Sequence, residues 1–101
     1  MKLRFLIPAM LLAAFGHASA QSPGAEQVRG WAASCSNCHG TQGRAVEGMV
    51  KLAGADRDAT LKKLLDFKNG RRPATVMHQL SKGYSDEQLA AIAGWFAAQK
   101  P

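Results

Sequence analysis

The chain has 101 residues, of which 47% are hydrophobic and 20% are charged, and its formal net charge is +6. This balance excludes disordered, strongly acidic and collagen-like chains, and the length allows a single domain. The longest apolar run lies at the extreme N-terminus, which also excludes a polytopic membrane protein.

Residues 1–20 have the pattern of a secretory signal peptide. Lys2 and Arg4 form a basic start, an apolar stretch too short to span a bilayer comfortably follows, and residues 18–20 (Ala-Ser-Ala) form a cleavage site. We therefore predict a single mature domain over residues 21–101 that is periplasmic and does not span a membrane; an uncleaved anchor is the alternative. Cleavage removes two positive charges and no acid, which leaves +4. Export and the scatter of the charges disfavour nucleic-acid binding and favour acidic protein partners.

The first predicted element of the mature chain is a helix that begins near Glu26. Val28, Trp31 and Ala32 share one face of this helix. Asn37 and the glycines after it then indicate a long irregular loop.

The second predicted helix begins at Asp56 or Asp58, either of which can cap it. Its short apolar face has helical spacing and consists of Leu61, Leu64 and Leu65. Residues 69–70 (Asn-Gly) are a typical helix stop, and a loop over residues 71–84 is expected to follow.

The last predicted helix has the clearest start. Ser85 is its N-cap, and Gln88 stands three residues on, as in a capping box. Its apolar stripe consists of Leu89, Ile92, Ala93 and Phe96. No strand pattern is present, so we predict an all-α fold with three main helices and two long loops that wrap a ligand.

A domain of this size buries only about 60–65% of the surface of its unfolded chain. Small secreted domains therefore usually need a disulfide, a metal or a cofactor. The chain has two cysteines, which allow at most one disulfide, so we expect a bound group to complete the core.

Cys35, Cys38 and His39 form a C-x-x-C-H motif, which is typical of c-type haem attachment in an exported protein. Cysteines at i and i+3 place both sulfurs on one side of a turn, where each can form a thioether with one haem vinyl group. We predict one covalently bound haem c, with His39 as an axial ligand of the iron.

Other chemistries fit this motif less well. A thiol redox pair needs a preceding strand in a βαβ unit, and none is indicated. A zinc site needs a fourth ligand, and His78 is the one other histidine of the mature chain. A disulfide between Cys35 and Cys38 would close too small a loop to stabilise much.

The candidates for the second axial ligand are Met49, Met77 and His78. Met49 follows His39 so closely that the chain could hardly reach the opposite haem face. Met77 lies beyond a whole helix, after Pro73, whose ring stiffens the approach. We predict Met77, and His78 is the alternative, which would give a bis-histidine site of lower potential.

The pattern resembles the class I c-type cytochromes over residues 24–101. The matching features are Trp31 before the first cysteine, the attachment box at residues 35–40, Met77 after an Arg/Pro loop, and residues 93–96 of the terminal helix. The resemblance implies a small cytochrome c fold, with the three helices wrapped around the haem and a contact between Trp31 and Trp95.

Residues 67–68, 74–77 and 82–85 are similar to the cytochrome subunits of flavocytochrome c sulfide dehydrogenases, here in a single-haem form. This implies a flavoprotein partner, sulfide-derived electrons, and one-electron transfer by a carrier that is not itself an enzyme. One alternative is a free soluble carrier that serves a terminal oxidase or another haem protein. Another is an open-site haem enzyme or sensor.

In many class I cytochromes a proline after the haem box offers its carbonyl to the histidine N–H, and no proline lies between His39 and Pro73. We expect a backbone carbonyl of residues 44–52 to take this role. Arg71 or Arg72 is a candidate partner for a haem propionate. The apolar residues expected to keep the haem dry are Leu52, Leu61, Leu64, Leu65, Val76, Leu80, Leu89 and Ile92. The lysines that could guide an acidic partner, or serve only solubility, are Lys51, Lys62, Lys63, Lys68 and Lys82.

Overall fold

The computed structural model describes residues 23–101, so the predicted signal peptide lies outside the described residues. Within that range the chain forms the helices α1 (Ala25–His39), α2 (Arg57–Lys68), α3 (Val76–Lys82) and α4 (Asp86–Ala97), with a short 3-10 turn, η1 (Thr41–Gly43), after α1. The described part contains no strand, which confirms the all-α prediction. No helix in it is long and apolar enough to cross a membrane.

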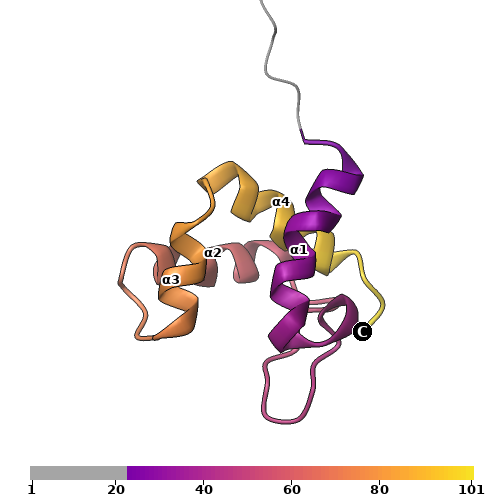
Figure 1. Ribbon diagram of the computed structural model, residues 1–101, viewed down its shortest axis with the longest axis horizontal. Coiled ribbons are helices and arrows are strands. Elements are labelled where there is room, and N and C mark those ends of the chain that lie inside the picture. The colour runs from indigo at the N-terminus through magenta and orange to yellow at the C-terminus, as the bar shows by residue number, and fades with distance from the viewer. Residues whose placement is uncertain (1–22) are drawn as a thin grey trace, which may run out of the picture.

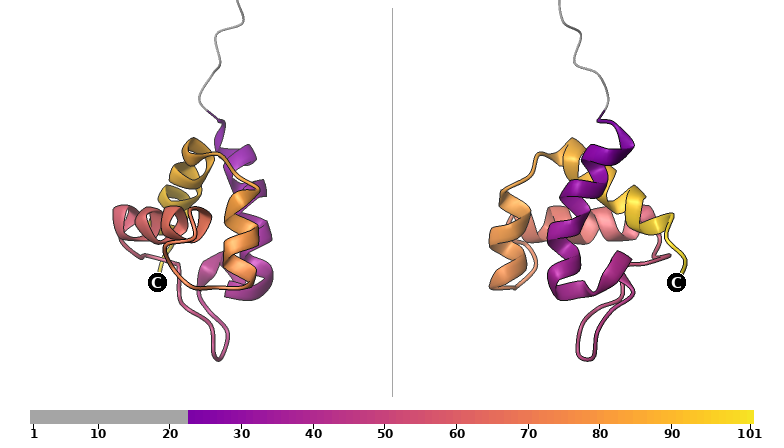
Figure 2. Two further views of the ribbon diagram at one scale, coloured as in Figure 1. Left: turned by 90° about the vertical axis from the view of Figure 1, so that its left-hand side faces the viewer. Right: turned by 45° about the vertical axis from the view of Figure 1, so that its right-hand side comes forward.

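The helices pack as a chain of pairs. α1 lies against α4, α4 against α2, and α2 against α3. The views agree that α1 and α3 stand on the same side of α2 (Figures 1 and 2). Within residues 23–101, α1 and α3 make few direct contacts with each other, unlike the three pairs above.

The core lies where α1 crosses α4. Its centre is formed by Ala32, Ile92 and Phe96, each at most 2% exposed. Trp31 and Trp95, the two aromatics that the resemblance paired, both pack against this cluster. Leu89 and Ile92, which we expected to cover the haem, are fully buried, and Ile92 belongs to the cluster itself.

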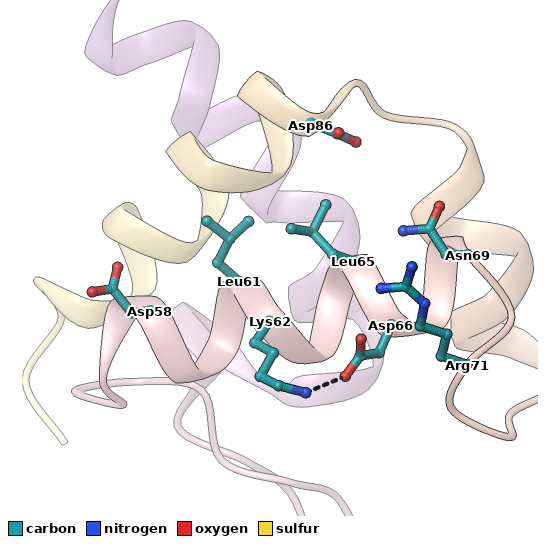
Figure 3. A pocket seen from close by; sticks show the side chains of 8 residues that line it. All are labelled: Asp58, Leu61, Lys62, Leu65, Asp66, Asn69, Arg71 and Asp86. Carbon is teal, nitrogen blue, oxygen red and sulfur yellow. Dashed lines mark hydrogen bonds and ion pairs between the residues drawn. The ribbon is translucent and has the colours of Figure 1, made fainter.

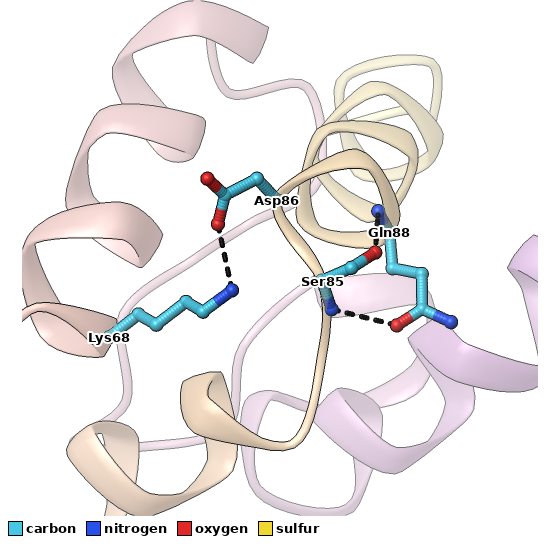
Figure 4. Close-up of polar contacts among 4 residues, drawn as sticks. All are labelled: Lys68, Ser85, Asp86 and Gln88. Atoms are coloured by element: carbon cyan, nitrogen blue, oxygen red, sulfur yellow. Dashed lines mark hydrogen bonds and ion pairs between the residues drawn. The ribbon is translucent and has the colours of Figure 1, made fainter.

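The helix starts follow the local sequence. Asp56 caps α2 and accepts the Ala59 N–H at 2.9 Å, so the first of the two predicted caps is the right one. Ser85 and Gln88 form the predicted capping box of α4 (Figure 4). Asn69 follows the last residue of α2, which confirms the predicted stop.

Two boundaries differ from the predictions. α1 continues through Asn37 to His39, so the whole C-x-x-C-H motif is helical, and the predicted loop starts only at Gly40. The predicted loop over residues 71–84 contains α3, which has no side-chain cap and a single buried residue, Ser81. Val76, Met77 and Leu80 have helical spacing, but α3 has only seven residues, so this short pattern does not distinguish it from a loop.

Candidate functional site

The last turn of α1 presents the three residues of the attachment motif. Cys35 is half-buried and packs against the core, whereas Cys38 is exposed. Burial raises the pKa of the Cys35 thiol, and a hydrogen bond with Ser34 opposes this in part. Both cysteines are free thiols and stand at i and i+3 of one helix, so they lie on one side of it.

His39 is buried at the end of α1, and its ring is fixed by the loop that follows. Its Nδ1 lies 2.7 Å from the carbonyl oxygen of Val50. Because a carbonyl only accepts, Nδ1 carries the proton and Nε2 keeps a free lone pair, as a metal-binding imidazole requires. The carbonyl comes from residues 44–52, so the expectation about what orients His39 is confirmed.

The same loop is tied to the backbone of His39. The Ala45 N–H donates to the His39 carbonyl at 2.7 Å, and Gly40 makes the sharp turn between them with a φ of +87°. A Cβ on Gly40 would lie 3.0 Å from the carbonyl carbon of Ala45, so this close return of the chain favours glycine. The loop therefore holds the histidine at both its ring and its main chain.

Met77 and His78 are neighbours on α3 but have different surroundings. His78 Nδ1 lies 2.8 Å from the carbonyl oxygen of Phe67, in the last turn of α2. Met77 is half-buried, and successive residues of a helix point about 100° apart, so Met77 is directed away from that contact. Met49, the third candidate, lies in the loop after α1 and is 39% exposed.

A group of large apolar side chains on the loop after α1 and on α3 is not covered by protein. Between 39% and 64% of the surface of each side chain is exposed. The residues are Val46, Met49, Val50, Val76 and Leu80. Val76 and Leu80 were expected to line the haem, and they flank Met77 on α3. Apolar side chains on the loop that orients His39 and on the helix that carries Met77 suit a flat apolar group between them.

Ser81, on α3, has a buried hydroxyl without a hydrogen-bond partner among the described residues. It lies one turn after Met77 and is 1% exposed. A buried hydroxyl without a partner costs about 1–3 kcal/mol. The thiols, the oriented imidazole, the thioether and the uncovered apolar side chains together fit a covalently bound haem.

Two of the five lysines that could guide an acidic partner form ion pairs within the protein. Lys62 pairs with Asp66 and Lys68 pairs with Asp86, each at 2.7 Å, the second joining the end of α2 to the start of α4 (Figure 4). Lys51, Lys63 and Lys82 form no ion pair with the described residues. Of the five lysines predicted to guide a partner, these three are therefore the ones without a carboxylate partner among residues 23–101.

The two arginines after α2 lie in an exposed segment. The Arg72 guanidinium sits over the Phe67 ring, 5.5 Å from its centroid. Arg71 lines an open pocket of about 580 Å³ on α2, whose apolar part is Leu61 and Leu65 (Figure 3). That pocket contains none of the predicted haem ligands, although Leu61, Leu65 and Arg71 were expected near the haem.

One contact at the site was not foreseen from the sequence. Tyr84 Oη lies 2.8 Å from Ser34 Oγ, and Ser34 also donates to the Trp31 carbonyl at 2.7 Å. This contact joins the segment after α3 to α1, beside Cys35. A tyrosine and a serine fifty positions apart carry no local signal, so only the fold could show that they meet.

Comparison with known proteins gives several relatives. The chain is 40% identical over 63 residues to the cytochrome subunit of sulfide dehydrogenase of Chlorobaculum tepidum, which covers 62% of this chain and 57% of that protein. It is 41% identical over 70 residues to cytochrome c4 of Pseudomonas aeruginosa, or 68% of this chain and 35% of that protein. It is 32% identical over 78 residues to cytochrome c-553 of Helicobacter pylori, or 75% of this chain and 81% of that protein. The chain thus spans only about half, or less, of the first two relatives, and no protein-family model matches it.

Proposed function

This chain belongs to the class I c-type cytochromes, and from that premise we propose that it is a periplasmic one-electron carrier whose haem is bonded to Cys35 and Cys38 and ligated by His39 and Met77. Its family carries covalently attached haem c, and its partners are redox proteins. The observation that carries the proposal is the end of α1. There two thiols and an imidazole with a free Nε2 stand together on one turn.

When bound, haem c supplies the iron that takes up and returns one electron. Cys35 and Cys38 would hold the group through thioethers, formed by addition of each S–H across a vinyl group, which needs no oxidant. The Val50 carbonyl holds the Nδ1–H of His39, so Nε2 would be left to ligate the iron. Val76 and Leu80, which are exposed here, would shield a bound haem from water on the side of α3. A thioether from Met77 would give a higher potential than a second histidine.

The axial pair is tested by exchanging each methionine in protein exported from a host with haem-attachment machinery. We expect Met77→Ala to remove the far-red ferric band of sulfur ligation and to lower the reduction potential. Met49→Ala is the matched control and should change neither. Loss of the band in Met49→Ala alone, or its absence from the wild type, would contradict Met77 as the ligand.

The partner is proposed from the relative named as the cytochrome subunit of sulfide dehydrogenase. We expect electrons to come from a sulfide-oxidising flavoprotein that binds this chain as a subunit. Purification from the native cells should then yield a complex that contains flavin. A cytochrome that elutes alone and is reduced by several donors would favour the alternative of a free soluble carrier.

A further inference from the structure

The helix that carries Met77 cannot hold its own position. α3 has seven residues, its N-cap Thr75 makes no side-chain hydrogen bond, and Ser81 is its one buried residue. Isolated helices of fewer than about 12–15 residues are marginal in water. The direction in which Met77 points must therefore be set by contacts between this segment and the rest of the chain.

Besides packing, α3 is joined to α2 by a side-chain hydrogen bond of His78. Its Nδ1–H donates to the Phe67 carbonyl at 2.8 Å, and the same carbonyl accepts the Gly70 N–H at 3.2 Å. The ring also lies over the turn that ends α2, since a Cβ on Gly70 would be 3.7 Å from His78 Cε1. A carbonyl oxygen has two lone pairs, so a carbonyl at a helix C-terminus can accept this side-chain N–H beside a backbone N–H.

The second tether lies at the other end of the segment. The hydrogen bond between Tyr84 and Ser34, at 2.8 Å, joins the residues after α3 to α1. This contact limits how far the segment can move away from α1. It does not fix the rotation of α3 about its own axis, because Tyr84 lies beyond the end of the helix.

We propose that His78 is a positioning residue that fixes the rotation of α3 and so directs the Met77 thioether toward the iron. The inference rests on the proposed function, since it takes Met77 as the ligand. With His78 bound to α2, its neighbour is turned by about 100° from that contact, along the side that also carries Leu80. Without the Phe67 contact the short helix can rotate or fray, and Met77 spends more time away from the iron.

The test measures how readily an external ligand replaces Met77. Ferric holoprotein is titrated with imidazole, and the far-red band and the reduction potential are recorded on the same samples. A hydrogen bond of ordinary net strength corresponds to about a fivefold change in an equilibrium constant. We expect His78→Ala to bind imidazole about fivefold more tightly, with a weaker far-red band and a lower potential.

Two further variants separate positioning from a general loss of structure. His78→Asn keeps an N–H close to the place of Nδ1 and should restore the wild-type affinity and band. Gln79→Ala changes the exposed neighbour on the same helix and should have no effect. If His78→Ala does not fold, His78→Gln replaces it, because the longer glutamine does not place its N–H at the same point.

Three results would overturn the inference. The first is a His78→Ala protein with the imidazole affinity and band of the wild type. The second is a His78→Asn protein as defective as His78→Ala. The third is a wild type whose spectrum lacks sulfur ligation and changes only when His78 is replaced, which would make His78 a ligand. Only the third also contradicts the proposed function, so the two failures are distinguishable.

Discussion

Gly43 is the position at which a single added carbon should do most harm to the support of the site. Its φ is +72°, and a Cβ there would lie 2.6 Å from Phe96 Cδ1 and 2.9 Å from Leu52 Cβ. Phe96 is 1% exposed and belongs to the core cluster, so its ring has little room to move. The Gly43 carbonyl also accepts the N–H groups of Leu52 and Ala53, which closes the base of the loop that holds His39.

The cost of Gly43→Ala has two parts. An L-residue in the left-handed region costs about 1–2 kcal/mol, and overpacking a well-packed core costs about 1–3 kcal/mol. We therefore expect the free energy of unfolding to fall by about 2–5 kcal/mol. Gly48→Ala separates the two parts, because its φ is +82° and an added Cβ there meets nothing within 4 Å. The free energy of unfolding of Gly48→Ala should fall by only about 1–2 kcal/mol.

The assay is guanidinium unfolding of the three holoproteins, followed by far-UV circular dichroism, with equal m-values as the check on two-state behaviour. The midpoint of Gly43→Ala should lie clearly below that of Gly48→Ala. Equal losses in the two variants would show that the close approach of Phe96 does not constrain this turn, and would refute the reasoning.

Further predictions follow from the ion pairs and the caps. Ser85→Ala removes the cap of α4 and should lower the free energy of unfolding by about 1 kcal/mol in the same assay. The hydrogen bond from Lys62 lowers the pKa of Asp66 below its ordinary 3.8, so the pair stabilises the fold above that pH and this stabilisation is lost as the pH falls through the folded pKa. Unfolding of wild type and Asp66→Asn should therefore differ at neutral pH and converge in acid, and a constant difference would contradict the assignment. Reversing Lys51 and Lys82 to Glu should slow reaction with an acidic redox partner about tenfold at low salt, and a rate that does not depend on salt would exclude steering.

The site could be predicted from the sequence where its chemistry is local. The two thiols and the imidazole lie within one turn, so their spacing alone indicates what they can bind. The caps of α2 and α4 were predictable for the same reason, because Asp56 and Ser85 each bond to the N–H three residues on. The orienting carbonyl was foreseen as a role for residues 44–52, and the structure assigns it to Val50.

The parts that escaped prediction depend on contacts between distant segments. α3 lies in a segment that was expected to be a loop, and it is held by contacts with the rest of the chain such as that of His78 with α2. The ion pair between Lys68 and Asp86 could not be foreseen either, since the two residues lie 18 positions apart on different helices. Only Lys62 lies at helical spacing from its carboxylate.

The central claim is that Cys35 and Cys38 hold one haem covalently. The most direct measurement is the intact mass of the exported protein after acid-acetone extraction, which removes haem that is not covalently bound. The account predicts the mass of the chain plus one haem, because addition of a thiol across a vinyl group loses no atoms. A colourless polypeptide with the mass of the chain alone would contradict it and would return the two cysteines to thiol or metal chemistry.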